Sequence, residues 1–144
     1  MAHSGEPAIE TVDVEGIREY LTQSSVEFAI LFGSHAQGTA SDTSDVDIAI
    51  RFPEELTDYE RFSLRNRIDA DLQEYAAGFV DVSDIETLPN PVAYAALQDG
   101  IRLVGDSQTI DTYQGQINRE YETAASERKQ ERREFIDRLA RGDV

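Results

Sequence analysis

The sequence predicts an α/β (α+β) fold: a single domain with a small mixed β-sheet, helices packed mainly on one face, and a further helix at the C-terminal end. Two apolar segments of strand length, 26–32 and 45–52, carry this prediction, because polar or turn-forming residues bound each of them. Segments with helical spacing of apolar residues lie around them. A length of 144 residues fits one domain core. We therefore expect a compact domain over 1–111 and a charged helical extension over 112–144.

The other elements follow from local patterns. Three segments with apolar residues three to four apart are expected to be helices: 13–23, 58–76 and 91–98. Two further short segments are expected to be strands: 79–85 and 101–104. Gly, Ser, Thr and Asp dominate 33–44, which predicts a turn with room for one helical turn. From residue 112 a broken apolar stripe among charges predicts a long surface helix, or a segment that orders on a partner.

The chain is strongly acidic, with 29 acidic and 13 basic residues, a net charge of −16 and a single lysine, Lys129. Such a charge repels free nucleic acid, which is therefore an unexpected partner. The carboxylates are spread along the whole chain, so we assign them to the surface of a folded protein. Dispersed acid with almost no lysine resembles the proteins of salt-in halophiles, where molar salt screens charges beyond about 3 Å. We hypothesise a haloarchaeal source.

The composition also excludes several classes of protein and site. No apolar segment approaches the roughly 20 residues that span a bilayer, and the first residues lack the basic and apolar regions of a signal peptide. We expect no membrane partner and a cytoplasmic location. The chain has no cysteine and only two histidines, which excludes disulfides, cysteine nucleophiles and thiolate or histidine-rich metal sites. Any metal is expected to be held by oxygen.

Asp45 and Asp47 are the first candidate site residues. Two residues apart on a strand, they project from the same face, while their apolar neighbours point into a core. Adjacent carboxylates repel one another unless a cation such as Mg²⁺ lies between them. The same spacing recurs at Asp69 and Asp71, but these lie in a predicted helix, where residues two apart diverge by about 200°. We interpret Asp71 as part of a solvated helix face.

A second half of a site precedes this strand. Gly33 and Ser34 follow a buried strand, at a junction where backbone N–H groups can point together at an anion. Gly33 lets a phosphate approach without a Cβ in the way, and Ser34 adds a hydroxyl donor. Alone, such a turn more often simply ends a strand and binds no ligand. A phosphate turn and a carboxylate pair joined by a short loop together predict a metal–nucleotide site.

The turn at Gly33 and Ser34, a second glycine and the pair Asp45 and Asp47 resemble the signature of the DNA polymerase β-like nucleotidyltransferase superfamily. The resemblance covers about residues 15–105. In size and downstream pattern the chain is similar to the minimal nucleotidyltransferases (MNT), many of which are antitoxins encoded beside HEPN-domain toxins. The resemblance implies the single-domain nucleotidyltransferase fold, with Gly33, Ser34, Asp45 and Asp47 binding the nucleotide.

The superfamily adds a third carboxylate from a neighbouring strand, for which this chain offers Asp81 and Asp84. Asp81 matches the family pattern because it lies between two valines, whereas Asp84 falls at the strand end. The resemblance implies that Asp45 and Asp47 bind two Mg²⁺ ions. Asp81 would complete one metal site and help to deprotonate the attacking hydroxyl. ATP is the implied substrate.

One position departs from the family pattern: many members carry Arg before the second glycine, and this chain has Gln37. A guanidinium that pairs with phosphate is therefore missing. Arg51, Arg65 or Arg102 could replace it, although each reads more naturally as an ordinary surface residue. His35 could hydrogen-bond the nucleotide, but we favour a structural or exposed role for it.

The function implied by the resemblance is transfer of AMP from Mg·ATP to a hydroxyl, plausibly a tyrosine, of a HEPN-domain toxin, which silences the toxin. Two alternatives stay open. In the first, the chain is a binding antitoxin with a vestigial nucleotide site. In the second, it modifies a small molecule of the aminoglycoside type, whose positive charge would suit the acidic surface. Nucleic-acid polymerisation is the least favoured, because the chain has no basic tract.

Overall fold

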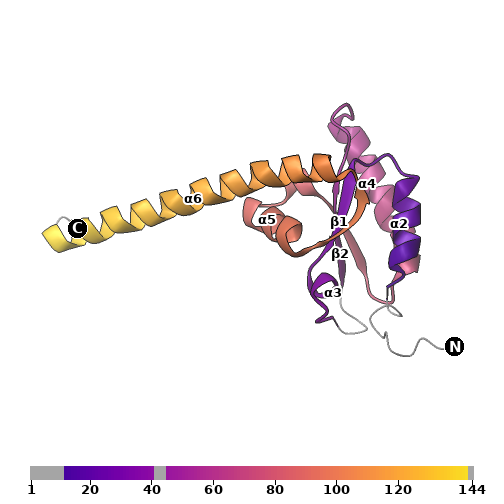
Figure 1. Cartoon of the computed structure of the whole chain (residues 1–144), viewed down its shortest axis with the longest axis horizontal. Coiled ribbons are helices and arrows are strands. Elements are labelled where there is room, and N and C mark those ends of the chain that lie inside the picture. The colour runs from indigo at the N-terminus through magenta and orange to yellow at the C-terminus, as the bar shows by residue number, and fades with distance from the viewer. Residues whose placement is uncertain (1–11, 41–44, 143–144) are drawn as a thin grey trace.

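The computed structural model describes residues 12–40 and 45–142 of the chain (Figure 1). The helices are α2 (Val14–Thr22), α3 (Ser34–Gln37), α4 (Asp58–Leu72), α5 (Asn90–Asp99) and α6 (Ser107–Arg141), with the short 3₁₀ turns η1 (Gln73–Tyr75) and η2 (Ile85–Thr87). The strands are β1 (Phe28–Phe32), β2 (Val46–Arg51), β3 (Val80–Asp84) and β4 (Ile101–Gly105). Every element expected from the sequence is present, although α6 begins earlier than expected. Of the turn expected over 33–44, residues 41–44 lie outside the described part.

The four strands form one sheet in the order β3-β2-β1-β4. β1 pairs with β2 and with β4 in antiparallel orientation, whereas β2 and β3 are parallel. Parallel neighbours need a crossover connection, which α4 supplies between β2 and β3. The mixed sheet and the α/β fold class are therefore confirmed.

Helices α2 and α4 cover one face of the sheet. Asp13 caps α2 by accepting a hydrogen bond from the Gly16 amide at 2.9 Å, and Thr57 and Glu60 form a capping box at the start of α4. Both helices pack buried apolar side chains against the strands: Ile17, Leu21, Ile68 and Leu72 against Val46, Ile48, Val80 and Val82. This layer fixes the positions of β2 and β3.

The opposite face is covered in part by α5 and the beginning of α6. A second apolar cluster joins them to the strands, and its members include Phe28, Ile30, Ala49, Ala93, Leu97, Ile110, Tyr113 and Ile117. Helices therefore lie on both faces, a more even distribution than the expected packing mainly on one face. The physical reason is that the first apolar residues of the C-terminal segment pack on the sheet.

Helix α6 extends far beyond the sheet (Figure 1). We call residues 1–118 the body. The last ring contact of α6 with the body is a stacked pair of Tyr94 and Tyr121, with ring centroids 4.0 Å apart. Residues 126–141, which we call the arm, are all exposed. The expected division between residues 111 and 112 falls inside this helix, and it stays a prediction about separate units. Along 12–40 and 45–142, no helix combines the length and apolar character that crossing a bilayer requires.

Candidate functional site

Two aspartates lie side by side on adjacent strands. Asp47 of β2 and Asp81 of β3 are direct partners in the parallel register of the sheet. Val46 and Val82, next to them in sequence, are buried under α2 and α4 on the other face. Because side chains alternate along a strand, Asp47 and Asp81 project together from the face that carries α5 and α6. Both remain partly exposed there.

The turn at Gly33 lies directly against Asp47. Phe32, the last residue of β1, is the register partner of Asp47, so the chain reaches Gly33 beside that carboxylate. Gly33 has φ +82°, in the left-handed region, and a Cβ added to it would lie 2.5 Å from Asp47 Oδ2. Only glycine therefore fits at this position, because a side chain would be strained and would collide with Asp47.

Asp47 is the electrostatic centre of the site. Partial burial raises the pKa of its carboxyl above the usual value, and the negative charges of Asp81 and Asp45 raise it further. A smaller opposing effect comes from His35, which lowers the pKa of Asp47. The charged form of Asp47 is thus disfavoured, which a cation bound beside this carboxylate would relieve.

The donor chemistry suits a hard divalent cation, because all three candidate ligands are carboxylates. Asp45 is exposed immediately before β2. Across 12–40 and 45–142, no three carboxylate or imidazole side chains are grouped closely enough to hold a metal ion. The sheet therefore supplies a preformed pair, Asp47 and Asp81, with Asp45 nearby.

Helix α3 follows Gly33 and begins at Ser34. It ends at Gly38, whose φ of +76° turns the chain so that the Thr39 amide donates to the Ser34 carbonyl at 3.0 Å. His35 is partly buried, and its effect on Asp47 places it near the acidic pair. Gln37 is exposed. Whether His35 has a structural role or contacts the nucleotide stays a prediction.

The other acidic candidates lie elsewhere. Asp84 pairs in register with Ile50, and its Oδ1 accepts a hydrogen bond from the Glu86 amide at 2.9 Å, which caps η2. Asp69 accepts a hydrogen bond from the Val82 amide, and exposed Asp71 accepts one from the Tyr20 hydroxyl. Asp81, and not Asp84, is thus the carboxylate beside Asp47.

The three arginines considered as replacements for the missing guanidinium are held in structural contacts. Arg51 pairs with Glu86 at 3.2 Å and lies over the Tyr113 ring. Arg65 Nε donates to the Val82 carbonyl at 2.8 Å. Arg102 pairs with Asp111 at 2.6 Å. Each one therefore stabilises the fold at its own position.

The sequence model of the family described as polymerase beta, nucleotidyltransferase matches residues 15–109, well over half of the chain. This chain belongs to that family. The matched region includes the Gly33 turn and all three candidate carboxylates, and it ends in the first turn of α6. The expected superfamily resemblance is confirmed, and the arm lies outside the matched region.

Solved toxin–antitoxin structures share this fold. A toxin–antitoxin structure with AMP-PNP has a TM-score of 0.65 and 22% identity, over 85% of this chain and 98% of that one. An MntA–HepT toxin–antitoxin structure has a TM-score of 0.57 and 18% identity, over 85% of this chain and 97% of that one. A tri-AMPylated Shewanella oneidensis HEPN toxin in complex with MNT antitoxin gives a TM-score of 0.59 and 17% identity, over 85% of this chain and 98% of that one. Among curated protein sequences, none matches this chain.

The structure places most of the candidate site residues close to one another. Gly33, Asp47 and Asp81 come together, Ser34 opens α3 and Asp45 precedes β2. The steric fit between Gly33 and Asp47 was missed, because it requires the register of β1 against β2.

Proposed function

We propose that this nucleotidyltransferase transfers AMP from Mg·ATP to a tyrosine hydroxyl of a HEPN-domain toxin and so acts as its antitoxin. The observation that carries the proposal is the Asp47–Asp81 pair beside the Gly33 turn, within a chain of the polymerase beta nucleotidyltransferase family. The solved toxin–antitoxin structures of the same fold, one with AMP-PNP and one with an AMPylated toxin, support the choice of nucleotide and acceptor.

The chain's residues have separate roles in this proposal. The Gly33 and Ser34 turn binds the phosphates of ATP through backbone N–H groups and the Ser34 hydroxyl. Asp45, Asp47 and Asp81 hold two Mg²⁺ ions, which supply charge stabilisation at the phosphate oxygens when bound. Asp81 helps to remove the proton from the acceptor hydroxyl, whose oxygen then bonds to the α-phosphorus while pyrophosphate leaves.

The test uses the purified chain, its HEPN-domain partner, ATP and Mg²⁺, with the intact mass of the partner as the measurement. We expect the partner to gain the mass of AMP with the wild-type chain. Asp47→Asn and Asp81→Asn should abolish this gain, because each removes a carboxylate of the pair. Asp71→Asn is the matched control, since exposed Asp71 lies on α4 away from the site. An unmodified partner in a stable complex with the wild-type chain overturns the proposal.

A second candidate function is neutralisation by binding alone. It is favoured by the exposed Gln37, where the family pattern has a guanidinium, and by the lack of a preformed three-ligand group in the described residues. The double variant Asp45→Asn, Asp47→Asn separates the two functions. Retained neutralisation of the toxin supports binding alone, whereas lost neutralisation with an intact complex supports AMP transfer.

A further inference from the structure

The arm continues an apolar stripe that begins in the core. An α-helix returns to the same orientation after 18 residues, or five turns. Phe135 therefore points in the same direction as Ile117, and Leu139 in the same direction as Tyr121. Ile117 is buried against the sheet, and Tyr121 is stacked on Tyr94. The stripe that packs on the body thus continues along the arm, where its side chains are exposed.

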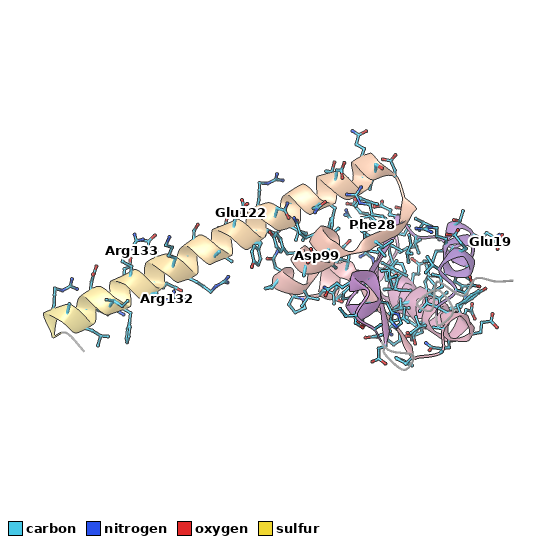
Figure 2. All side chains as sticks on the ribbon, turned by 60° about the horizontal axis from the view of Figure 1, so that its bottom comes forward. Glu19, Phe28, Asp99, Glu122, Arg132 and Arg133 are labelled. Atoms are coloured by element: carbon cyan, nitrogen blue, oxygen red, sulfur yellow. The ribbon has the colours of Figure 1, made fainter. Side chains whose placement is uncertain are left out.

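The exposed apolar area on this stripe is large for one end of a helix. Phe135, Ile136 and Leu139 are 49%, 54% and 45% exposed. They lie within five residues of one another. The helix that carries them projects away from the part of the molecule that contains Phe28 (Figure 2). Exposed apolar side chains gathered on one helix face mark a surface for another molecule.

The charge of the arm differs from that of the body. Residues 1–118 contain 22 acidic and 6 basic residues, whereas residues 119–144 contain seven of each. Two of the basic residues, Arg128 and Arg132, lie on the apolar stripe itself, since Arg128 is 18 residues after buried Ile110 and Arg132 is four residues further. Glu131, 18 residues after buried Tyr113, lies along the edge of the same stripe, so the stripe carries a net positive charge that favours a covering surface with carboxylates.

We infer that the arm is a docking surface for the protein acceptor, which binds it through an apolar surface with carboxylates opposite Arg128 and Arg132. This inference rests on the proposed function for the identity of the acceptor. The arm, with its six basic and four acidic residues, is also where an acidic partner avoids the repulsion of the body. Specific binding there combines apolar burial with charge complementarity.

The direction of the stripe connects docking with the site. The buried part of the stripe packs on the sheet face from which Asp47 and Asp81 project. The exposed part continues past α5 toward the C-terminal end (Figure 1). A protein seated on the arm consequently lies on the same side of the sheet as the two carboxylates. Docking there holds the acceptor at high effective concentration near the site.

A second copy of this chain fits the stripe less well. Antiparallel pairing of two arms that sets Phe135 against the small residue Ala125 also sets Arg128 against Arg132. Parallel pairing sets each arginine against itself. Either arrangement brings guanidinium groups together in the seam, where the two arginines of each arm outnumber the one carboxylate beside them, Glu131.

The test measures the affinity of the purified HEPN-domain partner for two sets of variants. Arg128→Glu with Arg132→Glu reverses the charge on the stripe, and Phe135→Gln with Leu139→Gln removes its apolar groups. Arg133→Glu with Arg141→Glu is the matched control, because it changes the charge equally on the opposite side of the helix. We expect each stripe variant to raise Kd and the KM for the partner about tenfold or more. The control should change both by less than about twofold, and kcat and AMP-PNP binding should stay unchanged in all variants.

The outcomes separate this inference from the proposed function. Unchanged Kd in the stripe variants overturns the docking surface even when AMP transfer is normal. Equal weakening by the stripe and control charge variants also overturns it, because the effect then follows charge and not the face. A wild-type dimer in sedimentation that the stripe variants alone dissociate, with unchanged partner affinity, assigns the stripe to a second copy. If the partner stays unmodified but the stripe variants weaken the complex, the proposed function fails and the docking surface stands.

Discussion

The contact between Gly33 and Asp47 makes one glycine specific to the site. We predict that Gly33→Ala lowers stability by more than the roughly 1 kcal/mol that a left-handed alanine costs, and abolishes AMP transfer. The reason is that the new Cβ would lie 2.5 Å from Asp47 Oδ2 and would displace the carboxylate. Urea denaturation and the mass assay on the HEPN-domain partner measure the two effects.

Gly38 provides the matched control for this prediction. Its φ of +76° is close to the +82° of Gly33, but none of the residues that the structure describes lies within 4 Å of a Cβ added there. Gly38→Ala should therefore show the backbone strain alone, with AMP transfer largely retained. Equal loss of stability and activity in the two variants would show that the contact with Asp47 is unimportant.

The partial burial of Asp47, together with the negative charges of Asp81 and Asp45, predicts a pH dependence of folding. Because the pKa of Asp47 is raised in the folded chain, its protonated form is favoured by folding. This contribution to stability is fully present below about pH 3.9, the usual pKa of aspartate, and is lost as pH rises through the raised value. Asp47→Asn removes the titration, so without Mg²⁺ its stability relative to wild type should increase as pH rises from 4 to 7. A constant difference across this range in chelator-treated samples contradicts the prediction.

At the residue scale, strand periodicity predicted that Asp45 and Asp47 share a face, whereas the family pattern selected Asp81. The structure places Asp47 and Asp81 on the face opposite their buried valine and isoleucine neighbours. The pairing of Asp47 with Asp81, and of Phe32 with Asp47, depends on strand register. Register is set by long-range pairing, which a single sequence does not specify.

The outer edge of β3 is protected by side chains of the crossover. The Gln73 side chain, just past α4, both accepts from the Val80 amide and donates to the Val80 carbonyl, at 2.9 and 2.7 Å. Asp69 accepts from the Val82 amide, and Arg65 donates to the Val82 carbonyl. An unpaired strand edge invites pairing with another chain, and these three residues occupy it. The strand that carries Asp81 is therefore held by the helix that precedes it.

We predict that Gln73→Ala destabilises the domain by about 2 kcal/mol and increases aggregation on heating, because both backbone groups of Val80 lose their partner. Urea denaturation and light scattering measure the two effects. Glu74→Ala is the control, since Glu74 is an exposed neighbour in η1. The same loss of stability in both variants would assign the effect to the end of the helix and not to the strand edge.

At the element scale, apolar periodicity located the strands and the longer helices, and turn-forming residues located α3, but neither pattern could reveal how the elements are joined. Asp69 was excluded as a metal ligand because residues two apart on a helix diverge, and its hydrogen bond to Val82 agrees with that exclusion. Its role at the strand edge could not be predicted, because it depends on where β3 lies. The early start of α6 was missed since Asp106 caps it ahead of the apolar stripe that marked the segment.

The whole molecule carries its negative charge on the body. Residues 1–118 contain 22 of the 29 acidic residues and only six basic ones, while residues 119–144 contain equal numbers of acidic and basic residues. Ion pairs such as those of Glu86 with Arg51 and Arg61 offset part of this charge, but six basic residues cannot offset 22 acidic ones. The composition therefore implies a body that repels itself over the Debye length of the solution. The expectation of a haloarchaeal source stays a prediction.

We predict that the thermal midpoint of unfolding rises with KCl between about 0.1 and 2 M, because the Debye length falls from about 10 Å to under 3 Å and screens the self-repulsion of the body. Circular dichroism at several KCl concentrations measures the midpoint. A variant with Glu19→Lys and Glu74→Lys, two exposed positions on the body, should be more stable at low salt and respond less steeply to KCl.

Salt also strengthens apolar burial in every protein, which raises the midpoint without reference to charge. Equal slopes in the wild type and the variant would therefore assign the salt effect to apolar burial, whereas a shallower slope in the variant assigns it to the net charge of −16.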